Sequence, residues 1–167
     1  MLKSRAFCSI ALSLMVFTCQ AQIFNIEHTT DSTAVIVLTT DSSRNEWQID
    51  YPVYQFQQGD IDGDGIAEAF VGVTKSTRFD SVSRKRLFIF KNFRNLIRPM
   101  WMGSSLGHEM IDFVYADGRI RAAVKNIKNK CAVGEYVWDK FGLSLQRWIE
   151  RDISEEKARE LLIINSE

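Results

Sequence analysis

Residues 59–73 read GDIDGDGIAEAFVGV, and this stretch carries the densest chemical signal in the 167-residue chain. Four acidic residues fall within nine positions, at Asp60, Asp62, Asp64 and Glu68. Carboxylates held this close repel one another unless a cation lies among them. The five residues that follow are small, aromatic or β-branched, which is typical of a buried strand. The stretch therefore predicts an acidic loop that leads directly into a β-strand.

The spacing predicts a set of oxygen ligands for one cation. Asp60, Asp62, Asp64 and Glu68 offer carboxylates, and Ile66 offers its backbone carbonyl. Ligation by oxygen alone favours Ca²⁺ over Zn²⁺ or copper, and Mg²⁺ tends to keep its own waters. Gly63 and Gly65 permit the sharp turn that such a loop needs. The alternative is a solvated acidic turn that binds no ion.

The loop differs from an EF-hand, because Val71 stands where a bidentate glutamate is required and a strand replaces the second helix. Residues 56–74, with Phe56 and Gly59 ahead of the acids, resemble the calcium loop of FG-GAP and VCBS-type repeats of integrin-like β-propellers. The resemblance implies a β-meander blade with a structural Ca²⁺ between strands, in exported or extracellular proteins. Only one clear copy is present, since residues 112–118 (DFVYADG) keep an Asp-Gly pair but lack the other acids.

Alternating and β-branched segments recur along the chain after residue 33 and predict strands. They cover residues 34–38, 47–56, 68–74, 86–91, 96–102, 110–115, 119–124, 134–138 and 143–149. Turn residues separate them. Residues 154–163 have helical spacing with acids in the first turn. The pattern predicts an all-β, antiparallel meander fold with a short C-terminal helix packed against a sheet.

A weak internal repeat groups these strands into units of about 50 residues, the length of a propeller blade. Phe90 and Trp101 are followed 48 and 47 residues later by Trp138 and Trp148. The Asp-Gly pairs at 64–65 and 117–118 lie 53 apart. The chain holds about three such units, whereas a closed propeller needs at least four blades. We therefore expect about three sheets, in an incomplete propeller, an oligomer or an open stack.

The first residues predict an export signal. Lys3 and Arg5 precede an apolar run over 6–17, which is too short for a transmembrane helix. Cleavage after Ala21 gives a signal peptide over 1–21 and a chain that starts at Gln22. Alternatively, residues 16–19 act as a loose lipobox and Cys19 becomes a lipid anchor. The β-repeat domain then spans 22–151 and the helix and tail 152–167, in the periplasm, the cell envelope or outside the cell.

Charge and cysteine content exclude several classes of function. Twenty-one basic residues balance 21 acidic ones, so the chain carries no overall positive charge for gripping nucleic acid. The short basic run at 84–86 is expected at a solvated hairpin. Cys131 is the one cysteine after the leader, which precludes an intrachain disulfide there. We expect Cys131 to be a small buried residue.

Residues 103–107 (GSSLG) match the G-x-S-x-G nucleophile motif, but only His108 follows Ser105, and a strand rather than a helix comes next. We therefore expect no hydrolase. Glu109 and Asp112 could act as acids only if a cleft paired them, and nothing in the sequence does so.

The sequence favours an exported, non-enzymatic Ca²⁺-binding β-repeat module with a structural or interaction role and a protein or glycan partner. The alternative is a carbohydrate-binding module of the cell envelope that uses exposed tryptophans near the loop. The four tryptophans, Trp47, Trp101, Trp138 and Trp148, alternate with polar residues, and this pattern favours the core over a sugar platform.

Overall fold

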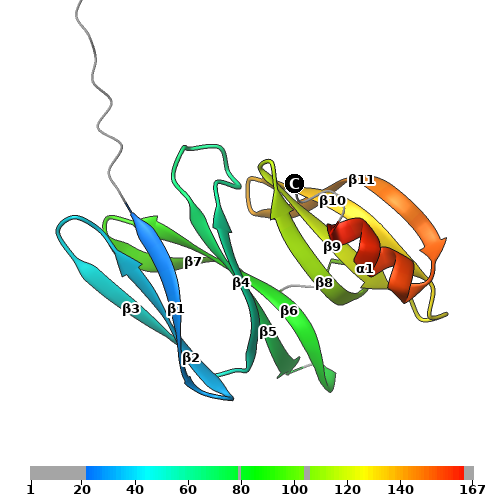
Figure 1. The fold of residues 1–167 in the computed structure, drawn as a ribbon, viewed down its shortest axis with the longest axis horizontal. Helices are drawn as coiled ribbons and strands as arrows, with labels where there is room; N and C mark the ends of the chain where they lie inside the picture. The colour runs from blue at the N-terminus through cyan, green and yellow to red at the C-terminus, as the bar shows by residue number, and fades with distance from the viewer. Residues whose placement is uncertain (1–21, 79, 104–105, 164–167) are drawn as a thin grey trace, which may run out of the picture.

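The computed structural model describes residues 22–78, 80–103 and 106–163. These residues form three antiparallel sheets that lie side by side, with one helix against the last sheet (Figure 1). Sheet A has the order β1-β2-β3, sheet B the order β4-β5-β6-β7, and sheet C the order β11-β10-β9-β8. Within this part of the chain the sheets remain separate. The predicted all-β fold with about three sheets and a C-terminal helix is confirmed, in the form of an open stack.

Sheet A contains a strand that the sequence reading missed. It consists of β1 (Ile23–Thr30), β2 (Thr33–Thr39) and β3 (Arg44–Ile49). In β1, Phe24 is fully buried and Ile26 packs against the same core, while Asn25 and Glu27 face solvent. This alternation is the period-two pattern of a half-buried strand, although only two apolar side chains carry it.

Sheet B consists of β4 (Val53–Gly59), β5 (Glu68–Thr77), β6 (Asp80–Phe93) and β7 (Leu96–Met102). The prediction of one strand over 47–56 is wrong, because the chain leaves β3 at Ile49 and enters β4, in another sheet, at Val53. Pro52 lies in the gap, where its missing N–H interrupts no ladder. Its carbonyl accepts a hydrogen bond from the Thr74 N–H at 2.9 Å, which fixes the crossover between the sheets.

Sheet C consists of β8 (Glu109–Ala116), β9 (Arg119–Lys125), β10 (Cys131–Asp139) and β11 (Gly142–Ile153). The repeat noted in the sequence follows this architecture. The Asp-Gly pairs at 64–65 and 117–118 both lie in the first connection of a four-stranded sheet, and Trp101 and Trp148 both lie in the last strand. β11 continues through Ile153, two residues beyond the boundary predicted at 151.

Two layers of apolar side chains hold the three sheets together. Along β5, Ala69, Val71 and Val73 face sheet A, and Phe70 faces sheet C. Sheet B is therefore buried on both faces. Fully buried rings fill both layers, with Phe24, Phe88 and Phe90 between A and B and Phe113 between B and C.

The two ends of the stack are finished differently. The helix α1 (Glu155–Ile163) places Ala158 and Leu162 on sheet C, against residues that include Ala123 and Val133. This confirms both the predicted helix and its packing. The outer face of sheet A instead carries charged residues, where Arg44 pairs with Glu27 at 3.1 Å and with Glu46 at 2.9 Å.

Candidate metal centre

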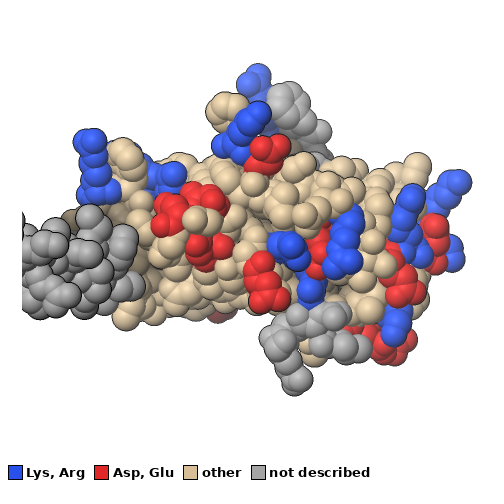
Figure 2. Space-filling model, turned by 90° about the horizontal axis from the view of Figure 1, so that it is seen from above, with Lys and Arg blue, Asp and Glu red and all other residues tan. Residues whose placement is uncertain are grey.

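The acidic loop connects two neighbouring strands of the middle sheet. β4 ends at Gly59 and β5 begins at Glu68, so both ends of the loop are fixed by strand pairing. Gly63 and Gly65 have φ values of 78° and 84°. This left-handed region strains residues with side chains, so the two glycines allow the loop to fold back on itself. Figure 2 views the molecule from the side on which this loop lies in Figure 1, and acidic side chains form a compact group there.

The structure brings together three of the five predicted ligands. One carboxylate oxygen from each of Asp60, Asp62 and Glu68 lies within 4.8 Å of the others. Asp64 is exposed, and its Oδ1 accepts a hydrogen bond from the Ile66 N–H at 2.8 Å. Ile66 is also exposed. The side chain of Asp64 therefore lies at the rim of the loop, apart from the three grouped carboxylates. The ligand predicted at Ile66 is its backbone carbonyl, and that part stays a prediction.

Glu68 is the buried member of the group, with 1% of its surface exposed. Its Oε2 accepts a hydrogen bond from the Ile61 N–H at 2.9 Å. The pKa of Glu68 is raised to about 7, chiefly by burial and also by the negative charges of Asp62, Asp64 and Asp60, against the lowering effect of the Ile61 N–H. A nearby cation would oppose these effects, because an opposite charge favours the ionised carboxylate.

Asp60 is oriented by the loop's own backbone. Its Oδ1 accepts from the Gly63 N–H at 2.7 Å, and its Oδ2 accepts from the Gly65 N–H at 2.8 Å. Asp62 Oδ1 accepts from the Asp64 N–H at 3.2 Å. These bonds hold the aspartates in one arrangement, which lowers the ordering cost of binding an ion.

The donor set fits Ca²⁺. Every ligand in the group is an oxygen, and two ligands on opposite sides of a Ca²⁺ ion stand roughly 4.6–5.2 Å apart, twice a coordination distance of about 2.3–2.6 Å. The carboxylate oxygens of Asp60, Asp62 and Glu68 lie within that span. Zn²⁺ and copper favour nitrogen and sulfur, which these three side chains do not offer.

Residues of sheet C contact the first residues of the acidic loop. Tyr115 on β8 donates its hydroxyl hydrogen bond to the Asp60 carbonyl at 2.8 Å, and its ring stacks on Phe70 with centroids 4.9 Å apart. A Cβ on Gly59 would stand 2.1 Å from the Tyr115 ring, so the glycine permits this approach. The side chain of Ile61 is buried between the two sheets. Sequence reasoning missed Tyr115, which is 55 residues from Asp60.

The other candidate residues that the structure describes lie outside the acidic loop. Ser104 and Ser105 lie outside the described residues, and strand β8 rather than a helix follows them, contrary to the requirement of the nucleophile motif. Glu109 pairs with Arg84 at 2.5 Å, and Asp112 pairs with Arg159 at 3.5 Å. Cys131 is buried as predicted, with 1% exposed.

The tryptophans pack against the cores between the sheets. Trp47 lies against the layer between sheets A and B, and the other three lie against the layer between B and C. All four are partly buried. Their placement agrees with the core interpretation, and Trp101 in addition lines a cavity between sheets B and C.

No family model, curated protein or solved structure matches this chain. Among the described residues, the helix is neither long nor apolar enough to cross a membrane. The predicted leader over 1–21, with Cys19, lies outside the described residues.

Proposed function

We propose that this chain is an exported, non-enzymatic β-repeat module in which the loop 60–68 binds Ca²⁺ in a structural role. The main support is the buried carboxylate of Glu68 beside Asp60 and Asp62. Three acids so close, one of them removed from water, repel each other at neutral pH, and a divalent cation would offset that repulsion. The resemblance of residues 56–74 to FG-GAP and VCBS-type loops is in keeping with this proposal.

The position of the loop supports a structural role for the ion. The loop joins β4 to β5 in the middle sheet and touches sheet C through Tyr115 and Ile61. An ion there would fix both a strand connection and the junction of two sheets. Ion binding confined to the folded state adds about 2.7 kcal/mol at a hundredfold excess over the dissociation constant. For a domain of this size that corresponds to a rise in Tm of roughly 5–10 °C.

Differential scanning calorimetry in millimolar Ca²⁺ and in EDTA tests the proposal. We expect Ca²⁺ to raise the Tm of the wild-type protein and to have little effect on Asp62→Asn. Asp41→Asn, in the β2–β3 turn, is the matched control and should keep the full response. Equal Tm values for the wild-type protein in both buffers would refute the calcium site.

Export is a separate part of the proposal and rests on the leader pattern. Mass spectrometry of the mature N-terminus distinguishes a chain that starts at Gln22 from one that starts at a lipidated Cys19. Recovery of an intact Met1 from the cytoplasm would contradict export. The biological role is then that of an interaction or scaffold module for a protein or glycan partner in the periplasm, at the cell envelope or outside the cell.

A further inference from the structure

A cavity lies between sheets B and C, at the end away from the acidic loop. It has a volume of about 680 Å³, within the range of small-ligand sites. Glu68 begins β5 and Thr77, which lines the cavity, ends it, so ten strand residues, roughly 30 Å, separate the two sites. Neither the acidic loop nor the calcium proposal involves this cavity.

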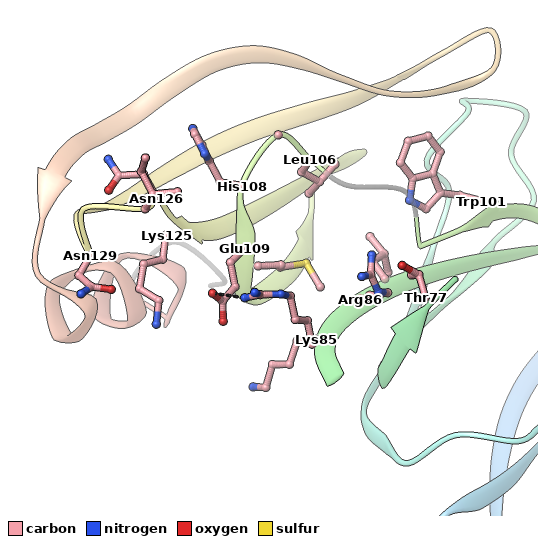
Figure 3. A pocket seen from close by; sticks show the side chains of 15 residues that line it. Thr77, Lys85, Arg86, Trp101, Leu106, His108, Glu109, Lys125, Asn126 and Asn129 are labelled. Atoms are coloured by element: carbon pink, nitrogen blue, oxygen red, sulfur yellow. Dashed lines mark hydrogen bonds and ion pairs between the residues drawn. The ribbon is translucent and has the colours of Figure 1, made fainter. Parts of the chain in front are cut away.

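The two walls of the cavity come from different sheets. Figure 3 shows Trp101, Thr77 and Arg86 on one side and Lys125, Asn126 and Asn129 on the other, with His108 and Glu109 between them. The first group belongs to sheet B, and the second to β9 and the loop that follows it. A ligand here would contact both sheets at once.

The charge of the lining is predominantly positive. Four basic side chains line the cavity, at Arg84, Lys85, Arg86 and Lys125, against the single carboxylate of Glu109. The ion pairs of the two lysines are long, with Lys85 3.9 Å from Asp112 and Lys125 3.8 Å from Glu155. Both distances exceed that of a hydrogen bond, and Lys85 Nζ also lies over the Tyr54 ring, 4.3 Å from its centroid. Among the side chains that the structure describes, adding the ion-pair partners Asp112, Glu155 and Arg159 gives five basic side chains and three acids.

Uncharged polar and aromatic groups complete the lining. Asn129 can both donate and accept hydrogen bonds, as sugar hydroxyls also do. The Asn126 amide can donate, while its Oδ1 already accepts from the N–H groups of Lys128 and Lys130. Trp101 supplies an aromatic surface and an indole donor. Gly142 leaves room for that ring, since a Cβ there would stand 2.3 Å from it. A simple inorganic anion would leave these groups unused.

Peptides that add to sheets pair with an open strand edge, and β8, which contributes Glu109 and Met110 to the lining, is the edge strand of sheet C. A peptide added there would be held by backbone hydrogen bonds along β8 and would leave unused the indole of Trp101, which lies on β7 of sheet B. From the charge, the amides and the indole we propose that this cavity binds an acidic sugar residue, with its carboxylate toward the basic side chains and its ring toward Trp101.

Titration calorimetry and tryptophan fluorescence with trigalacturonate test this assignment, at low ionic strength and in saturating Ca²⁺. Fully methyl-esterified trigalacturonate has the same sugar rings without the charge. We expect the acid to bind at least tenfold more tightly than the ester, and added salt to weaken its binding.

Variants locate the site. Lys125→Gln and Trp101→Phe should each weaken trigalacturonate binding by fivefold or more, and Trp101→Phe should remove most of the fluorescence change. Lys128→Gln is the matched control, because it removes the same charge three residues away from an exposed position outside the lining. It should change affinity less than twofold. The Tm of each variant, measured alongside, confirms that it is folded.

Four results would overturn the assignment. They are equal binding of acid and ester, binding of inorganic phosphate as tight as that of the sugar, tighter binding of hexaglutamate, and no binding of any probe. The experiment is repeated with Asp62→Asn in EDTA, where we expect unchanged sugar affinity. A failed calcium site and a failed sugar site therefore give different results.

Discussion

The hydroxyl of Tyr115 donates a hydrogen bond to the backbone carbonyl of Asp60 at 2.8 Å, which ties the first strand of sheet C to the first residue of the acidic loop. The same hydroxyl accepts a hydrogen bond from the Gly118 N–H at 3.3 Å. The Asp117-Gly118 turn of one sheet is thus linked through one side chain to the corresponding turn region of the other.

Tyr115→Phe should lower the free energy of unfolding by about 1 kcal/mol, because it removes this hydrogen bond and keeps the ring. It should also reduce the rise in Tm on adding Ca²⁺. Denaturant unfolding measures the first effect and calorimetry the second. Tyr136→Phe is the control, since the buried Tyr136 hydroxyl has no hydrogen-bond partner among the described residues. We expect this control to leave stability equal or higher, and an equal loss in both variants would contradict the role of Tyr115.

Gly59→Ala should destabilise the protein by about 1–3 kcal/mol, because the new methyl group overlaps the Tyr115 ring. Urea unfolding measures the loss. In a Tyr115→Ala background the same substitution should cost much less, since the ring is gone. Additive effects of the two substitutions would show that the contact is unimportant.

The raised pKa of Glu68 predicts a pH dependence in chelator. The carboxyl has a pKa near 4.5 when unfolded and about 7 when folded, so the folded state holds its proton more tightly. The protonated carboxyl contributes about 3 kcal/mol to the free energy of unfolding. This contribution is fully present below pH 4.5 and is lost as the pH rises through 7. Glu68→Gln should lack this loss, so in EDTA the variant should be the more stable protein at pH 8. Adding Ca²⁺ should restore the stability of the wild-type protein at pH 8 and should leave the stability of Glu68→Gln unchanged. Parallel pH profiles of the two proteins would argue against a buried Glu68 carboxylate.

Glu135 predicts the opposite pH dependence. It is fully buried, lies opposite Arg121 and Arg147 in the register of sheet C, and bonds to them at 2.9 and 2.5 Å. The hydrogen bond from Arg147 lowers its pKa, as does that from Arg121, against the effect of burial. Its stabilisation is therefore present above pH 4.5 and lost at more acidic pH.

Glu135→Ala should cost about 2 kcal/mol at pH 7, because it removes the buried carboxylate that pairs with the largely buried Arg121. The cost should shrink in acid, and urea unfolding at several pH values measures it. Glu46→Ala removes an exposed partner of Arg44 and should have a much smaller effect. Similar costs for both would show that burial at Glu135 is unimportant.

Leu162→Asp should loosen the helix from sheet C, because Leu162 is 6% exposed and belongs to the core between them. We expect a lower Tm and self-association in light scattering as apolar sheet surface becomes exposed. Ile163→Asp, at the neighbouring position that is 70% exposed, should remain monomeric. Monomeric, fully stable Leu162→Asp would contradict the covering role of the helix.

The local sequence pattern predicted most of the strands and the helix, because period-two alternation and acids in the first helical turn depend only on residues close together in the sequence. β1 was missed because only Phe24 and Ile26 face the core. The split at Pro52 was missed because alternation continues on both sides of it. The acidic loop was visible for the same local reason, but its contact with Tyr115 depends on how two sheets stack. The cavity was not predictable either, since its walls come from residues that meet only in the stack.

The outer face of sheet A carries Arg44 with its two glutamates, whereas the outer face of sheet C is apolar beneath a helix. The two ends of the stack of sheets therefore differ in chemistry. A further sheet stacked on sheet A would bury Arg44 and its two glutamates, and one stacked on sheet C would first have to displace the helix. Both ends of the stack therefore resist extension.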